Sequence, residues 1–198
     1  MSEKTPIKKK FILSEDGFNK LLSEDIMSVS KTHFTPIHIA ETATDWLTED
    51  GDKNILDIGA GIGKFCISGA LHSNSKFTGI EIRPSLVKVA KFLLKAYDLS
   101  NVEFYEQNSI DVDFQKFDAF YLYNPYYENI AHTKRLNNEL PLSEAYFRTY
   151  TKQTAYKLDQ LKIGTRVVTY HGDNHEIPVS YEKKRVSNDG LLKLWIKT

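Results

Sequence analysis

Cysteine is almost absent from this sequence, because Cys66 is the only one among its 198 residues. A single thiol excludes an intramolecular disulfide and suits a reducing compartment. The chain also has no apolar run that approaches the roughly 20 residues of a membrane-spanning helix, and its lysine-rich start lacks the apolar region of a signal peptide. We therefore expect a cytoplasmic protein without a membrane partner.

An excess of charge of one sign is also missing. Lysine plus arginine and aspartate plus glutamate both total 26, so no global field draws the chain to nucleic acid or to an anionic surface. The basic runs at residues 8–10, 134–135 and 183–185 are expected to be solvated, and they make no strong nucleic-acid signature. No cluster of metal-ligating residues stands out, so the sequence predicts no metal site.

The most informative stretch is residues 54–65, in which a short apolar run leads into alternating glycines. The apolar run is typical of a parallel strand buried on both faces. Gly59, Gly61 and Gly63 then let the backbone turn tightly and approach a ligand, just before a helix with free N–H groups. Lys64 stands where a dinucleotide-binding fingerprint needs its third glycine. The stretch therefore predicts a loop for a different ligand.

The order Asp57-Ile58-Gly59-Ala60-Gly61-Ile62-Gly63 closely resembles the first motif of the class I S-adenosylmethionine-dependent methyltransferases. The resemblance implies that the chain is an enzyme of this kind and that S-adenosyl-L-methionine is its cofactor. Cys66 follows this loop closely. We expect it to be a small buried residue and not a nucleophile, because no feature of the sequence marks a base beside it.

Strand and helix patterns alternate along the chain. Strands are expected at residues 55–58, 77–82, 102–105, 118–123 and 166–170, and helices at 36–48, at 64–72 and from Pro84 onward. Thr35 would cap the first of these helices and Gly51 would end it. Two further strand-like runs, 179–186 and 191–197, are joined by an Asp-Gly turn that indicates a terminal hairpin.

These patterns predict an α/β fold. We expect a doubly wound, mainly parallel seven-stranded sheet with a C-terminal antiparallel hairpin and helices on both faces. Parallel units followed by such a hairpin resemble the sheet plan of the class I methyltransferases. The chain has the length of one domain, in which an N-terminal leader and helical extension over residues 1–35 precede the methyltransferase domain over residues 36–198.

The ribose, the adenine and the amino-acid end of S-adenosylmethionine each need a different kind of binding residue. Glu81 ends the second strand about 20 residues past the loop, and its carboxylate can accept both ribose hydroxyls. Ile82 would pack on the adenine ring, while Asn108 and Ser109, after the third strand, would offer an oxygen to its amino group. The family commonly has aspartate at the place of Asn108. The amino-acid end is expected near Asp57 and the loop residues Gly59, Ala60, Gly61 and Gly63.

The fourth strand ends in Asn124-Pro125-Tyr126-Tyr127. This order resembles the Asn-Pro-Pro-Tyr type motif of methyltransferases that act on planar nitrogens, such as adenine amino groups and glutamine side chains. In such a site a side-chain oxygen and a backbone carbonyl accept from the target NH2 group while an aromatic ring stacks on its plane. Tyr126 stands at the position of the second proline, which alters the turn.

Several readings of the acceptor remain open. A lysine amine could be surrounded by aromatic rings, and a small molecule could be enclosed by residues 128–142. A cofactor-binding domain without activity is the alternative from another class. His33 and His171 are candidate bases near the same rim. The aromatic residues considered for a lysine acceptor are Phe34, Tyr123, Tyr126 and Tyr127.

Overall fold

The computed structural model describes residues 13–130, 135–172 and 174–198. Most of the expected N-terminal leader, with the basic run at 8–10, lies outside these residues, and so does Lys134. Among the described residues, no helix is long and apolar enough to cross a membrane.

The described chain alternates helices and strands. In order, its elements are α1 Glu15–Asn19, α2 Glu24–His33, α3 Ile37–Leu47, β1 Asn54–Ile58, α4 Lys64–His72, β2 Lys76–Glu81, α5 Pro84–Tyr97, β3 Val102–Glu106, β4 Ala119–Tyr123, α6 Glu144–Asp159, β5 Arg166–Tyr170, β6 Tyr181–Val186 and β7 Leu192–Lys197. Three short 3-10 helices complete the set, namely η1 Ser109–Asp111, η2 Phe114–Lys116 and η3 Tyr127–Asn129.

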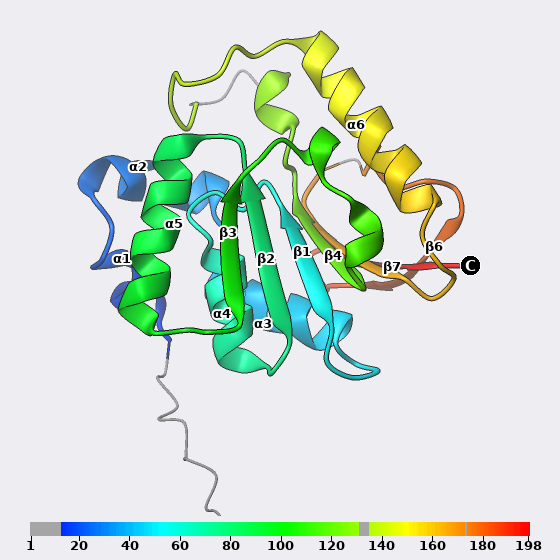
Figure 1. Cartoon of the computed structure of the whole chain (residues 1–198), viewed down its shortest axis with the longest axis horizontal. Coiled ribbons are helices and arrows are strands. Elements are labelled where there is room, and N and C mark those ends of the chain that lie inside the picture. Colours follow the sequence, from blue (N-terminus) through cyan, green and yellow to red (C-terminus); the bar gives the residue numbers. More distant parts are fainter. Residues whose placement is uncertain (1–12, 131–134, 173) are drawn as a thin grey trace, which may run out of the picture.

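One seven-stranded sheet in the order β3-β2-β1-β4-β5-β7-β6 forms the centre of the molecule (Figure 1). The first five strands pair in parallel, and β7 pairs antiparallel with both β5 and β6. The predicted fold is confirmed, including the terminal hairpin. Its turn contains Gly190, whose φ of 76° is the left-handed conformation expected of an Asp-Gly turn.

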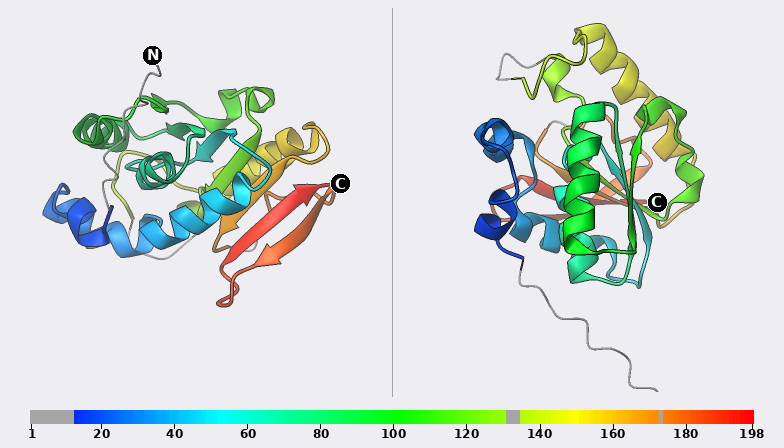
Figure 2. Two further views of the ribbon diagram at one scale, coloured as in Figure 1. Left: turned by 90° about the horizontal axis from the view of Figure 1, so that it is seen from below. Right: turned by 60° about the vertical axis from the view of Figure 1, so that its left-hand side comes forward.

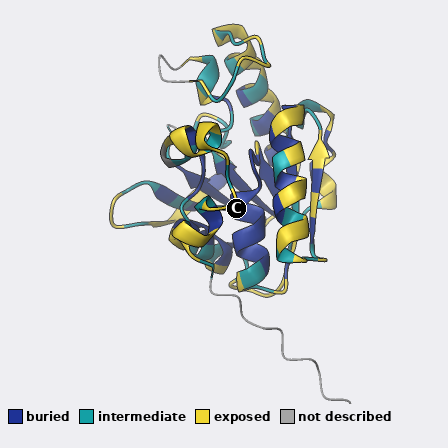
Figure 3. Cartoon of the chain, turned by 90° about the vertical axis from the view of Figure 1, so that its left-hand side faces the viewer, coloured by how far each residue is buried: buried dark blue, intermediate teal, exposed yellow. Residues whose placement is uncertain are grey.

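Helices cover both faces of the sheet (Figure 2). Side chains alternate across β1, so that Ile55 joins the core beneath α3, α4 and α5, while Leu56 joins a second core beneath α6. Helix α5 buries only its inner side and has an exposed outer stripe (Figure 3), whereas α4 is buried from Lys64 to Ala70. The connection from β3 to β4 contains the two short 3-10 helices η1 and η2 in place of a long helix.

The helix predicted over residues 36–48 is present as α3 to within one residue at each end, but its expected cap residue, Thr35, and stop residue, Gly51, were wrong. Helix α3 begins after Pro36 and ends at Leu47, before Gly51. The Thr35 hydroxyl does not cap it, because it forms a buried 2.9 Å hydrogen bond with the Tyr121 hydroxyl. Glu15 accepts from the Ile37 N–H at the start of α3, so the Thr35 hydroxyl is free to satisfy the buried Tyr121 phenol.

The N-terminal helices pack beside the glycine loop. Glu15 accepts a 2.6 Å hydrogen bond from the Ile37 backbone N–H at the start of α3, and its other oxygen pairs with Lys64 at the start of α4. Phe18 is fully buried in the larger core. Helices α1 and α2 thus lie beside the sheet, and the Glu15 carboxylate connects α1 to the starts of α3 and α4.

Close packing around β2 generates a first prediction. A Cβ atom on Gly79 would lie 2.6 Å from the Phe104 ring and 2.8 Å from the Ala60 Cβ, and both neighbours are buried. Gly79→Ala should therefore lower the free energy of unfolding by about 1–3 kcal/mol, which urea denaturation will measure. Adding Phe104→Leu to this variant should recover part of the loss. A Gly79→Ala protein as stable as the wild type would contradict the packing described.

Candidate functional site

A cavity of about 580 Å³ opens where the parallel strands end, and this volume lies within the range of ligand pockets. The loops after β1 to β5 all contribute to its wall. The structure brings ten of the predicted site residues together in this wall, namely Gly59, Gly61, Glu81, Ile82, Asn108, Ser109, Asn124, Pro125, Tyr126 and Tyr127. Asp57, Ala60 and Gly63 are not part of it.

The glycine loop passes close to its neighbours. Gly59, Gly61 and Gly63 all have positive φ angles, which favour glycine. A Cβ on Gly63 would lie 2.2 Å from the Phe104 ring, and one on Gly61 would lie 3.1 Å from the Phe34 ring. Gly63 therefore lets α4 pack on the sheet, while Gly61 brings its backbone to the cavity wall.

Glu81 presents its carboxylate to the cavity from the end of β2. One oxygen accepts from the Gly61 N–H at 3.1 Å and the other from the Arg83 N–H at 3.0 Å. Burial raises the pKa of Glu81, and the N–H groups and the Arg83 guanidinium act in the opposite direction. Each carboxylate oxygen has more than one lone pair, so both can still accept from a ligand.

Asp57 lies beneath the glycine loop and is 3% exposed. The Cys66 thiol donates to its carboxylate at 3.5 Å. The pKa of Asp57 is raised to about 8, because burial and, to a smaller extent, the nearby charge of Glu81 raise it more than the Cys66 thiol hydrogen bond lowers it. Cys66 is buried, as the sequence predicted, and it is a partner of this carboxylate.

Side chains of α6 contact the loop after β3 and fix its position. Asn108 accepts from the Ile110 N–H at 3.1 Å through its side-chain oxygen and donates to the Tyr150 hydroxyl at 3.2 Å. Lys157 of α6 donates to the carbonyls of Ser109, Ile110 and Val112. Sequence reasoning did not find Lys157, because a lysine on a polar helix has no local feature that marks three carbonyl partners.

The turn after β4 is tightly constrained. Asn124 has a φ of 45°, an uncommon conformation for a residue with a side chain. A Cβ on Gly172 would lie 1.9 Å from the Asn124 side-chain oxygen, and one on Gly59 would lie 3.0 Å from the Pro125 Cβ. Glycines on two other loops thus make room for this turn at the cavity.

The two tyrosines of the turn have different surroundings. Tyr126 is 8% exposed, donates to the Ser109 hydroxyl at 3.0 Å and shares a 2.7 Å hydrogen bond with Thr154. Burial raises its pKa to about 12, and its ring stacks on Tyr150. Tyr127, in contrast, is 45% exposed. Tyr126 therefore ties the turn to α6, and Tyr127 is the ring of this pair that is open to a ligand.

The candidate bases and further aromatic residues line the other side of the cavity. His33 and His171 are both in its wall. The His171 ring stacks on Tyr123, and burial lowers the pKa of His171. The Tyr123 hydroxyl donates to the Thr32 carbonyl at 2.9 Å. Phe34, which is 5% exposed, lies in the same wall.

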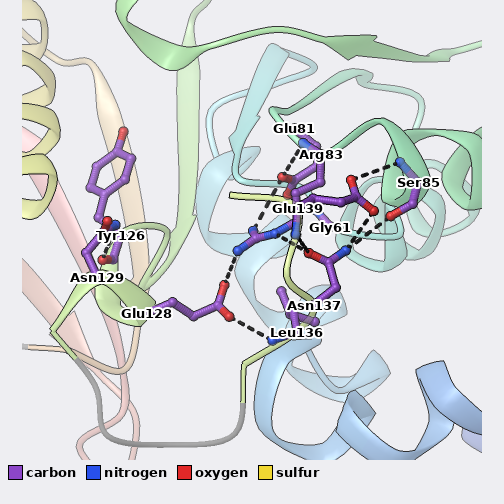
Figure 4. Close-up of polar contacts among 10 residues, drawn as sticks. All are labelled: Gly61, Glu81, Arg83, Ser85, Tyr126, Glu128, Asn129, Leu136, Asn137 and Glu139. Atoms are coloured by element: carbon purple, nitrogen blue, oxygen red, sulfur yellow. Dashed lines mark hydrogen bonds and ion pairs between the residues drawn. The ribbon is translucent and has the colours of Figure 1, made fainter. Parts of the chain in front are cut away.

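An ion pair connects the two sides of the site (Figure 4). The Arg83 guanidinium donates to Glu128 at 2.7 Å and lies 3.7 Å from Glu81. Sequence reasoning did not find Arg83, although its place between a strand end and a helix-starting proline marks it as a residue of the rim. In the described chain, no group of three or more histidine, cysteine, aspartate or glutamate side chains is placed to hold a metal ion.

Comparison with known proteins gives a consistent family match. Residues 49–183 match a family model described as a methyltransferase domain. A Methanocaldococcus jannaschii protein named for N5-glutamine methyltransferase activity on proteins is 31% identical over 94 residues, which cover 48% of this chain and 47% of that protein. Mouse EEF1A lysine methyltransferase 2 is 39% identical over 51 residues, which cover 26% of this chain and 21% of the mouse protein. The chain thus spans about half or less of the length of these relatives.

Solved structures share the fold. An RNA methyltransferase from Salinibacter ruber in complex with S-adenosyl-L-homocysteine aligns with a TM-score of 0.61 and 23% identity, over 82% of this chain and 92% of that chain. An O-methyltransferase from Bacillus cereus, also in complex with this compound, aligns with a TM-score of 0.61 and 14% identity, over 95% and 93%. At these identities the likeness concerns the fold alone.

The buried carboxyl of Asp57 generates a second prediction. Its pKa rises from the ordinary value of 3.8 to about 8 on folding, so the folded chain keeps a proton that the unfolded chain releases between these pH values. Stability must then fall as the pH rises through this range. Relative to Asp57→Asn, which cannot ionise, the wild type should lose up to about 1.4 kcal/mol of unfolding free energy per pH unit. Urea denaturation at pH 5, 6, 7 and 8 tests this, and parallel pH curves would contradict it.

Proposed function

This chain belongs to the class I S-adenosylmethionine-dependent methyltransferases, and from that premise we propose that it methylates the nitrogen of a planar amide or amino group. S-adenosyl-L-methionine is its methyl donor. The observation that carries the choice of acceptor is the Asn124-Pro125 turn, which is constrained at the cavity between glycines of two other loops.

The site fits the donor. Glu81 offers two oxygens to the ribose hydroxyls, and Gly59 and Gly61 bring their backbone to the same cavity wall. Ile82 and the Asn108-Ser109 loop lie beyond Glu81, where the adenine is expected. When bound, the cofactor supplies a methyl group activated by its sulfonium. The contribution of the protein is then to exclude water and to align the acceptor with that methyl group.

The turn after β4 would orient the acceptor. Among the described residues, no hydrogen bond involves the Asn124 side chain, and none reaches the Pro125 carbonyl. These two oxygens can therefore accept from the two hydrogens of a planar NH2 group. The exposed ring of Tyr127 can stack on the same group. Such a clamp holds the nitrogen lone pair toward the donor, and alignment of this kind supplies much of the rate of methyl transfer.

The acceptor that we favour is a side-chain amide of a protein. A relative is named for glutamine methylation, and the balanced charge of the chain offers little to a phosphate backbone. A lysine acceptor is less well supported, because Tyr123 stacks on His171 and Tyr126 stacks on Tyr150, which leaves these ring faces less open to an amine. A nucleobase amino group would satisfy the same clamp, so acceptor identification must include RNA.

The role of Glu81 gives a third prediction. Glu81→Gln keeps the size of the side chain but removes its charge and one of its two acceptor oxygens. The affinity for S-adenosylhomocysteine should weaken by about 1–3 kcal/mol, the range for hydrogen bonds to a charged group. Isothermal titration calorimetry measures this, with Glu144→Gln on the exposed face of α6 as the control. Equal affinities for wild type and Glu81→Gln would remove Glu81 from the site.

The role of Asn124 gives a fourth prediction. Asn124→Gly removes the side chain and suits the positive φ of this position, so cofactor affinity should stay the same. Labelled methyl transfer into cell extract should fall about 100-fold, the scale of a lost alignment. Asn124→Asp keeps an acceptor oxygen and should retain more activity than Asn124→Gly. If Asn124→Gly transferred the label as fast as the wild type, the planar-nitrogen proposal would fail.

A further inference from the structure

Arg83 is a buried cation between the donor and acceptor sides of the cavity. It directly follows β2 as the residue before α5, and it is 6% exposed. A buried guanidinium is stable only when its N–H groups are paired. Figure 4 shows its partners, which come from two separate parts of the chain.

On the donor side, Arg83 contacts Glu81 in two ways. Its backbone N–H donates to one carboxylate oxygen at 3.0 Å, and its guanidinium lies 3.7 Å from the same oxygen. Both contacts favour the charged form of Glu81, which is itself 6% exposed. Apart from Arg83, the backbone N–H groups of Gly61 and Ile82 stabilise this carboxylate at short range, so the guanidinium is its nearby positive charge.

On the acceptor side, Arg83 reaches a different segment. Its guanidinium donates to Glu128 at 2.7 Å and to the Asn137 side-chain oxygen at 3.2 Å. The second oxygen of Glu128 accepts from the Leu136 N–H at 2.8 Å. Asn137 also donates to the Ser85 hydroxyl at 3.2 Å. Residues 136–137 are therefore held on the turn between β2 and α5.

This segment forms part of the cavity wall. Leu136, Leu140, Pro141 and Leu142 all line the cavity. Their apolar side chains come from a stretch without helix or strand, so its position depends on contacts such as those of Arg83. Arg83 thus pairs with two carboxylates: that of Glu81 at the predicted ribose site and that of Glu128, which also holds Leu136 of the acceptor wall.

We propose that Arg83 is a positioning residue that holds Glu81 charged for the donor and, through Glu128 and Asn137, holds residues 136–142 in place as the acceptor wall. The inference rests on the proposed function, since it takes Glu81 as the ligand of the cofactor. It extends that function by making the two sides of the cavity share one ion-pair network.

The charges around Glu81 give opposite predictions for two substitutions. Asp57 on β1, Arg83 before α5 and Glu128 in η3 are the ionisable groups that act on it directly or through the shared cation. Arg83→Gln removes a positive charge and should make Glu81 protonate at higher pH. Glu128→Gln removes a negative charge, so that Glu81 becomes the one carboxylate paired with Arg83. Glu81 should then protonate at lower pH.

Calorimetric titration with S-adenosylhomocysteine between pH 5 and pH 9 tests this inference. The pH at which affinity is half lost should rise by about 1–3 units in Arg83→Gln, the range of a neighbouring charge. It should fall in Glu128→Gln and stay close to the wild-type value in Arg83→Lys. In a Glu81→Gln background, neither substitution should shift it, which separates Glu81 from Asp57. Arg148→Gln, which breaks an exposed ion pair on α6, is the matched control and should shift nothing.

Hydrogen exchange measures the second half of the inference without any ligand. Arg83→Gln and Glu128→Gln should both speed exchange over residues 136–142, while Arg148→Gln should not. Equal pH midpoints in wild type, Arg83→Gln and Glu128→Gln would overturn the inference and leave the proposed function intact. Failure of the wild type to bind S-adenosylhomocysteine at any pH would overturn both.

Discussion

A buried carboxylate at the end of β2 is the constraint around which this site is organised. Glu81 is almost fully buried, and a charge in that position must be compensated by nearby donors. The glycine loop provides one N–H group, and Arg83 provides another together with its guanidinium. The loop after β1 and the start of α5 are thereby arranged around a single acidic group. The same group faces the cavity, where the ribose of the cofactor is expected.

The second constraint is steric and concerns the approach of separate loops. Gly59 allows Pro125 to pack against the donor loop, and Gly172 leaves room for the side-chain oxygen of Asn124. A larger residue at either glycine would displace the turn after β4. Donor and acceptor sides are thus in direct contact through backbone and proline atoms. In the proposed function, this contact would hold the turn that orients the acceptor in a fixed place relative to the cofactor loop.

Local sequence patterns predicted those parts of the structure that local physics determines. The helix expected over residues 64–72 and the strand over 166–170 have the predicted bounds, because a glycine start and a β-branched apolar run act over short distances. Helix α6 was not predicted, since its buried side includes Thr151 and Thr154 in place of an apolar stripe. The roles of Arg83, Lys157 and Thr35 depend on partners far along the chain. Likewise, only the fold shows that Tyr126 points its hydroxyl to Ser109 and Thr154.

The identity of the methylated atom is the central claim of this account. The most direct measurement incubates the protein with S-adenosylmethionine labelled on its methyl group and with separate protein, RNA and metabolite fractions of the native cell. Mass spectrometry then locates the label in the product. We predict a label on the nitrogen of a planar amide or amino group, with the protein fraction as its main source. A label on oxygen, carbon or sulfur would contradict the assignment of the Asn124-Pro125 turn.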